Sequence, residues 1–177
     1  MAIAEAPRES AHQRPERPGL QVQRYFTRDG VHPYDEIEWE RRDAVIPGES
    51  GNVFEQKGVE VPKFWSMTAT NVVASKYFRG KLGTAARETS VRQMVDRVVD
   101  QICRWGVEGR YFATAGDAAI FGDELRYLMV HQHASFNSPV WFNIGVPGVR
   151  QQASACFILS VDDSMDSILD WFKNEGV

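Results

Sequence analysis

The stretch ASACFILSVDDSMDSI, residues 153–168, combines an apolar run, an acidic turn and a helix start. The apolar run predicts a buried strand that carries Cys156. Asp163 and Ser164 are good N-cap residues, and the helix that follows begins its apolar positions at Ile168. We therefore expect a thiol and a helix N-terminus, whose free N–H groups suit an anion, within a few residues of each other.

Each of these residues also has a purely structural interpretation. A single cysteine on an apolar strand is more often a packing residue than a reactive one. Asp163 and Ser164 could do no more than cap the helix. A ligand role is the alternative, in which the N–H groups face a phosphate and Asp163 accepts a hydrogen bond from a sugar hydroxyl. The residues alone leave both interpretations open.

Composition excludes several classes of protein. The chain has 177 residues and a formal net charge of -4, which argues against a general binder of nucleic acid or of membrane surfaces. No apolar run approaches the roughly 18 residues of a membrane span, and the N-terminus lacks the apolar core of a secretory signal. The two cysteines are too few for a disulfide scaffold. We therefore expect a cytoplasmic protein. No metal site is predicted at His131 and His133, because residues two apart on a helix do not face each other.

Local patterns predict the order of the elements. Residues 1–22 are rich in Pro, Arg, Glu and Ala and predict a disordered tail. Short strands are expected between Ile37 and Val61, interrupted by the Pro47–Gly48 turn signal and by Gly58. Three helices should follow, starting at the caps Ser66 and Ser90 and near Asp117. Gly80 and Gly106 would end the first two, and Phe121, Leu125, Leu128 and Met129 would form the buried face of the third.

The last part of the chain changes pattern. Two strands are predicted, over Val140–Ile144 and Ala153–Val161, with the Pro147–Gly148 loop between them. A final helix from Ser164 would end at Gly176. It would pack through Ile168, Leu169 and Phe172.

Several longer stretches resemble one enzyme family. From about Gln23 to the last residue the chain is similar to the adenosylcobalamin-dependent (class II) ribonucleotide reductases. Long matches of this kind are far more specific than a short motif. The stretches that carry the resemblance are GVHPYDEIEWE (30–40), VPKFWS (61–66), ATNVVASKYFRG (69–80), SVRQ (90–93), SFNSPVWFN (135–143) and residues 153–168.

The resemblance implies a fold and a domain order. It implies an α+β fragment with a tail over residues 1–22 and a mainly helical N-terminal domain, with short strands first, over residues 23–134. Residues 135–177 would be the first strands and helix of a ten-stranded α/β barrel, which is truncated here.

The resemblance also implies chemistry. The family reduces ribonucleotides to deoxyribonucleotides by radical chemistry, in which a thiyl radical abstracts a ribose hydrogen and two further cysteines supply electrons. Cys156 matches the first cysteine of that reducing pair. Ala155 matches a position where the family's backbone lies against the substrate. Ser138 matches a residue that contacts the substrate phosphate. The positions that match the site for a deoxynucleotide effector are Asp163, Ser164 and Met165.

The resemblance finally implies a cofactor, a substrate and protein partners. The complete enzyme would use adenosylcobalamin, a ribonucleotide substrate, a deoxynucleotide effector and a dithiol reductant protein, and would form a homodimer. The second reducing cysteine, the radical cysteine and its acid/base neighbours lie further downstream in the family. We therefore expect this chain to act with the remainder of a reductase and to be inactive alone. The alternative is a non-catalytic helical binding or regulatory module derived from the same family.

Overall fold

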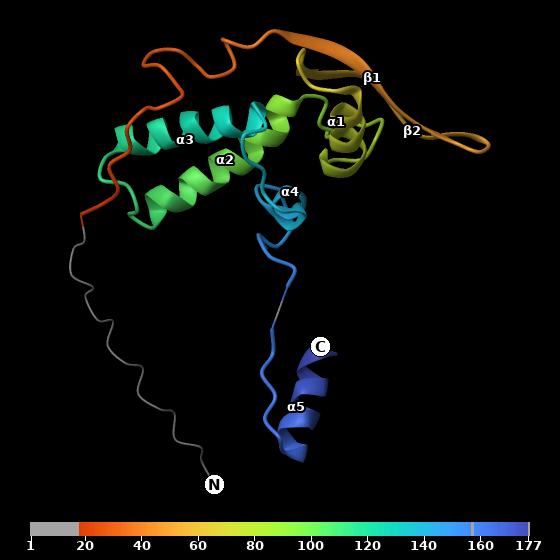
Figure 1. Ribbon diagram of the computed structural model, residues 1–177, viewed down its shortest axis with the longest axis vertical. Coiled ribbons are helices and arrows are strands. Elements are labelled where there is room, and N and C mark those ends of the chain that lie inside the picture. The colour runs from red at the N-terminus through yellow and green to blue at the C-terminus, as the bar shows by residue number, and fades with distance from the viewer. Residues whose placement is uncertain (1–17, 157, 177) are drawn as a thin grey trace.

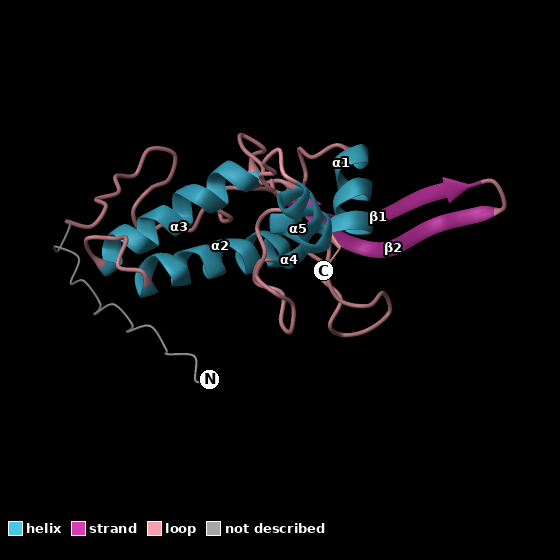
Figure 2. Cartoon of the chain, turned by 90° about the horizontal axis from the view of Figure 1, so that it is seen from below, coloured by secondary structure: helices cyan, strands magenta, loops and turns pink. Residues whose placement is uncertain are grey.

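A long β-hairpin is the only sheet in residues 18–156 and 158–176, which the computed structural model describes. Strand β1 (Trp39–Gly48) pairs with strand β2 (Gly51–Pro62) in antiparallel register, and the hairpin projects from the helices (Figures 1 and 2). The predicted Pro47–Gly48 turn signal falls at the end of β1. All the other described elements are helices, so the chain is an α+β structure, as expected.

The predicted break at Gly58 is a bulge inside β2. The pairing passes from Arg42 opposite Val59 to Ala44 opposite Gln56, so two residues of β2 face one residue of β1. Gly58 has φ +64°, and its N–H donates a hydrogen bond of 2.8 Å to Asp43 Oδ1. The left-handed conformation favours glycine, which lets the strand continue where the sequence predicted two separate strands.

The helix predicted from Ser66 begins there. Ser66 Oγ accepts the N–H of Ala69 at 3.1 Å and caps α1 (Met67–Val72). The chain then widens into the π-helix η1 (Val73–Tyr77), which ends before Gly80. The side chain of Arg87 donates to the carbonyls of Ala74 and Phe78 at 2.6 and 2.8 Å, so it satisfies backbone groups that the helix end leaves free.

Helix α2 (Val91–Glu108) has the predicted capping box of Ser90 and Gln93. The prediction that Gly106 ends this helix is wrong, because α2 continues to Glu108 and is capped at Gly109. Gly106 instead allows close packing: a Cβ atom there would lie 2.2 Å from Cε2 of Phe112. The residues of α2 that form its buried stripe are Val91, Met94, Val95, Val98 and Val99.

Helix α3 (Ala115–Val130) begins after Thr114, whose Oγ1 accepts the N–H of Asp117 at 3.1 Å. It packs along α2 (Figure 1). Of the predicted face only Met129 is buried, whereas Phe121, Leu125 and Leu128 are partly buried. Val130, which lies outside the predicted face, is also buried. The core formed by α2, α3, β2 and η1 includes Val61, Phe78, Val98, Val130 and Ile144.

The strand predicted over Val140–Ile144 is wrong. These residues belong mostly to α4 (Ser138–Asn143), which buries Val140 and Trp141. Asn137 stands at the N-cap position and Pro139 in the first turn, where a missing N–H costs no hydrogen bond. A short apolar run does not distinguish a strand from a buried helix. Pro139 suits the first turn of the helix, whereas the side chain of Asn137 makes no capping hydrogen bond.

The strand predicted over Ala153–Val161 is not formed in the residues described there. A strand needs a neighbour for its backbone hydrogen bonds, and no strand of the described chain pairs with this segment. Helix α5 (Met165–Glu175) starts after Ser164 and ends at Gly176, as predicted. Its predicted packing face is exposed, with Ile168, Leu169 and Phe172 at 43, 58 and 72% exposure, and α5 stands apart from the other helices (Figure 1).

Residues 1–17 of the predicted tail lie outside the described residues. Directly after them, Leu20 exchanges hydrogen bonds with the backbone of Tyr111 and Ala113, at 2.7 and 2.9 Å. The N–H of Val22 donates to Asp117 Oδ1 at 2.8 Å. These contacts fasten the chain to the start of α3. No described helix is both long and apolar enough to span a membrane.

Candidate functional site

Ser138 occupies the first turn of α4 and is held by a residue from another element. Its Oγ lies 3.1 Å from the hydroxyl of Tyr77, the last residue of η1. The ring of Tyr77 stacks on Phe142 with a centroid distance of 5.4 Å. Ser138 and Phe142 are four residues apart and share one face of α4. The half-buried hydroxyl of Ser138 is therefore fixed at the junction of η1 and α4.

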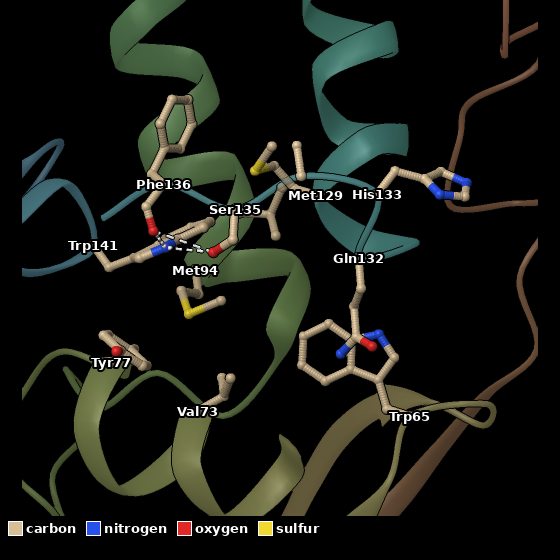
Figure 3. Close-up of a pocket in the computed structure, with 12 residues that line it drawn as sticks. Trp65, Val73, Tyr77, Met94, Met129, Gln132, His133, Ser135, Phe136 and Trp141 are labelled. Atoms are coloured by element: carbon tan, nitrogen blue, oxygen red, sulfur yellow. Dashed lines mark hydrogen bonds between the residues drawn. The ribbon is translucent and has the colours of Figure 1, made fainter. Parts of the chain in front are cut away.

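A cavity of about 420 Å³ lies beside this junction. It opens between η1, α2, the end of α3 and α4 (Figure 3). Both indole N–H groups on its wall have partners: that of Trp65 donates to the carbonyl of Val130, and that of Trp141 to the carbonyl of Phe136. The volume falls in the range of small-molecule sites. The lining residues are Trp65, Val73, Tyr77, Met94, Val95, Met129, Gln132, His133, Ala134, Ser135, Phe136 and Trp141.

Cys156 is exposed, which contradicts the expectation of a buried position on a strand. Its N–H donates to Ser154 Oγ at 3.3 Å. Ala155 beside it is also exposed. Cys103, on α2, is half-buried and forms no disulfide, and burial raises the pKa of its thiol. A raised pKa lowers the fraction of thiolate, so Cys103 has the properties of a structural cysteine.

Asp163 and Ser164 have different roles at the start of α5. Ser164 is the N-cap, because its Oγ accepts the N–H of Ser167 at 3.2 Å. Ser167 Oγ in turn accepts the N–H of Asp162 at 2.9 Å. The exposed side chain of Asp163 accepts no hydrogen bond from the described residues, so capping does not explain it. Met165 is 69% exposed.

The structure keeps these candidate residues in separate groups. Among the described residues, no hydrogen bond joins Ser138 to Cys156 or to the start of α5. The segment that leads to Cys156 is nevertheless tied to the end of α4, because Asn143 Nδ2 donates to the carbonyl of Gln152 at 3.0 Å. Sequence reasoning did not identify Tyr77 as the partner of Ser138. The two residues are 61 positions apart, and only the folded chain brings them together. No group of three or more possible metal ligands occurs in the part of the chain that the structure describes.

A family model matches residues 40–132, and its description is class II vitamin B12-dependent ribonucleotide reductase. Those residues run from β1 to just beyond α3. They form more than half of the chain.

Proteins named vitamin B12-dependent ribonucleotide reductase are similar over most of the chain. The protein from Streptomyces coelicolor is 58% identical over 161 residues, which are 90% of this chain and 16% of that protein. The protein from Rhodopirellula baltica is 42% identical over 186 residues, covering 88% of this chain and 18% of its own length. The protein from Agrobacterium fabrum is 30% identical over 222 residues, which cover 89% of this chain and 18% of that protein. The chain thus spans less than a fifth of the length of these relatives.

Proposed function

Because this chain belongs to the class II vitamin B12-dependent ribonucleotide reductases, we propose that it is the N-terminal segment of an enzyme that reduces ribonucleotides to deoxyribonucleotides. The observation that carries this proposal is the 58% identity to the Streptomyces coelicolor protein over 90% of the chain. The part left unaligned, about one-tenth of the chain, is shorter than the 21 residues that follow Cys156. A continuous alignment of this extent therefore includes both Ser138 and Cys156.

Cys156 is proposed as one of two cysteines that reduce the substrate. In the balanced reaction the 2′-hydroxyl leaves as water, a hydrogen takes its place, and two thiols become one disulfide. The partner thiol would come from the remainder of the reductase. The exposure of Cys156 supports this role, since a thiol that packs in the core could not reach a substrate.

Residues 135–177 are proposed to begin the catalytic α/β barrel, after a tail over residues 1–22 and an N-terminal domain over residues 23–134. Two features support the barrel. The segment over Ala153–Val161 has no partner strand in the described chain, and α5 leaves Ile168, Leu169 and Phe172 uncovered. Further barrel strands would supply backbone hydrogen bonds to the segment over Ala153–Val161. The rest of the barrel would also cover the exposed apolar side chains of α5.

The named relatives depend on vitamin B12, and we propose adenosylcobalamin as the cofactor of the complete enzyme. The cavity beside α4 has the size of a site for a drug-sized molecule, whereas a corrinoid is much larger. The described residues therefore do not fit the cofactor by themselves. Residues beyond this segment would hold it.

The nucleotide contacts are proposed as follows. The backbone at Ala155 would lie against the substrate, and Ser138 would contact its phosphate. Asp163, Ser164 and Met165 would bind a deoxynucleotide effector at the start of α5. A dithiol protein would reduce the disulfide, and the complete chain would form a homodimer in the cytoplasm.

A chimera tests the proposal directly. Residues 18–177 replace the aligned part of the Streptomyces coelicolor protein, which supplies the downstream residues. The chimera is expected to reduce ribonucleotides when adenosylcobalamin and a dithiol are present, whereas the 177-residue chain alone is expected to show no turnover. A folded chimera that binds nucleotides without reducing them would favour the regulatory-module alternative. Turnover by the 177-residue chain alone would contradict the assignment of the radical chemistry to downstream residues.

Asp163→Ala in the chimera is expected to weaken control by the effector more than basal turnover. Loss of a hydrogen bond to the effector sugar should cost about 1–3 kcal/mol of effector binding. The measurement is the choice between substrates at increasing effector concentration. Asp170→Ala is the matched control, because Asp170 is exposed on the same helix but lies away from its N-terminus. If both variants leave substrate choice unchanged, the effector site lies elsewhere.

A further inference from the structure

The segment before the hairpin, residues 20–29, forms a strap along α3. Its beginning is held at the start of that helix. Further along, the carboxylate of Glu124 accepts the backbone N–H groups of three successive strap residues at 2.9–3.1 Å, namely Tyr25, Phe26 and Thr27. These hydrogen bonds are largely exposed to water, and exposed hydrogen bonds add only modestly to stability. The packing of side chains must therefore help to keep this part of the strap in place.

The ring of Phe26 supplies such packing at the end of α3. It stacks on the ring of Tyr127 with a centroid distance of 5.1 Å, and on the ring of His133 at 5.8 Å. The ring of His131 stacks on Tyr127 at 4.0 Å and on Phe64, from the link between β2 and α1, at 5.3 Å. The planes of these contacting rings lie within 28° of each other. Five rings from three segments thus form one cluster, which we call the ring clasp.

Two rings of the clasp can change their charge near neutral pH. The imidazoles of His131 and His133 have centroids 6.0 Å apart and planes inclined by 16°. Neither imidazole forms a hydrogen bond or an ion pair with a carboxylate of the described residues. Neutral imidazoles pack well on aromatic rings, whereas two positive charges at this separation repel each other.

The surroundings of His131 oppose its protonation. Burial lowers the pKa of His131, and the charge of His133 lowers it further, against the opposing effect of Glu36. Glu36 is itself paired with Arg28 of the strap, with an N–O distance of 3.5 Å. The pKa of His131 is thus lower in the closed clasp than in an open one. The open form binds more protons below about pH 6.5, so acidification favours opening.

The carboxylate that holds the strap does not titrate in the same range. The pKa of Glu124 is lowered despite its partial burial, because Thr27 and the N–H groups of the strap donate to it. A carboxylate with a lowered pKa stays ionised where imidazoles gain their protons. A change of the strap near pH 6 would therefore report on the histidines and not on Glu124.

We propose that the ring clasp is a pH-sensitive switch, which holds residues 25–29 on α3 while both imidazoles are neutral and lets them detach when the imidazoles are protonated. Protonation of neighbouring histidines changes packing in this way without any other ligand. His133 also lines the cavity beside α4, and its ring points outward from that cavity (Figure 3). The switch therefore connects the strap to one wall of the cavity.

Hydrogen exchange of the 177-residue chain tests the switch. The protection of the Phe26 and Thr27 amides, corrected for the intrinsic exchange rate, should fall several-fold between about pH 7.5 and about pH 5.5. The amide of Leu20, which donates to the carbonyl of Tyr111 away from the clasp, should keep its protection. Unchanged protection of Phe26 and Thr27 would overturn the switch. So would an equal loss at Leu20 and in the core of α2, because it would show general unfolding in acid.

A double variant, His131→Phe with His133→Phe, keeps an aromatic ring at both positions and removes the titration. The amides of Phe26 and Thr27 should then be equally protected at both pH values. His32→Asn is the matched control, because the ring of His32 contacts Tyr34 outside the clasp and asparagine retains an acceptor for the Tyr34 N–H. This control should retain the pH dependence. A pH dependence that persists in the double variant would contradict the proposal.

The single variant His133→Phe keeps the test valid if the double variant does not fold. The pKa of His131, followed by NMR, should rise in this variant, because the neighbouring positive charge has been removed. The pH dependence of strap protection should also become smaller. If the pKa of His131 does not change, the two imidazoles do not act on each other and the switch is refuted.

Discussion

Cys156→Ser in the chimera is expected to abolish repeated turnover with a dithiol reductant while nucleotide binding stays nearly unchanged. Serine preserves the size of the side chain and some hydrogen bonding, but it cannot form the disulfide that each reduction leaves behind. The measurement is the amount of deoxynucleotide formed per enzyme with excess dithiol, alongside nucleotide affinity. The disulfide requires Cα atoms within about 7 Å, so the partner cysteine must lie directly beside Cys156 in the complete enzyme.

Cys103→Ser is the control for this experiment. Cys103 is half-buried on α2, and its Sγ lies 4.0 Å from the carbonyl of Ala118. The change should lower stability slightly and leave the chemistry intact. Full turnover by Cys156→Ser would end the proposed redox role of that residue. Loss of turnover in both variants, with folding preserved, would show that the effect is not specific to Cys156.

Phe78→Ala is expected to lower the free energy of unfolding by about 3–5 kcal/mol. Phe78 follows η1 and is 2% exposed in the core beside α2, so its removal leaves a cavity as well as losing apolar burial. The measurement is urea unfolding of the 177-residue chain, followed by circular dichroism.

Phe172→Ala is the matched control, because the same side chain is removed from α5, where it is 72% exposed. This change should shift the free energy of unfolding by less than about 0.5 kcal/mol. A large loss from Phe172→Ala would mean that α5 packs on the core. A small loss from Phe78→Ala would show that the core does not depend on this ring.

Features that depend on a few neighbouring residues could be predicted from the sequence. Ser66, Ser90 and Ser164 each cap the helix that their local pattern predicted, because capping needs only the next three residues. The hairpin turn at Glu49–Ser50, directly after the Pro47–Gly48 signal, is of the same kind. The two wrong strands, over Val140–Ile144 and Ala153–Val161, depend on what lies beside them in space, and an apolar run does not contain that information.

In the candidate site, too, some features could be predicted from the sequence and others depend on the folded chain. The local pattern of the sequence points to Cys156 and Asp163 but leaves their roles open. The resemblance of whole stretches to a family is what assigns roles to them and to Ser138. The contact between Tyr77 and Ser138 and the hydrogen bond from Arg97 to the carbonyl of Ile144 join residues that are 61 and 47 positions apart in the chain. No local pattern predicts such contacts, because they arise only when η1, α2 and α4 pack together.

The position of the core along the chain has a consequence for synthesis on the ribosome. All the buried residues of the core cluster lie between Tyr34 and Ile144. At about 5–20 residues per second, translating residues 145–177 takes about 2–7 seconds, which exceeds the millisecond folding times of many mixed α/β domains. Cys156 follows Ile144 by only 12 positions, so the ribosome exit tunnel still encloses Ile144 when Cys156 is added to the chain. The core therefore completes its folding only after Cys156 has been synthesised, while Cys156 itself is still leaving the ribosome.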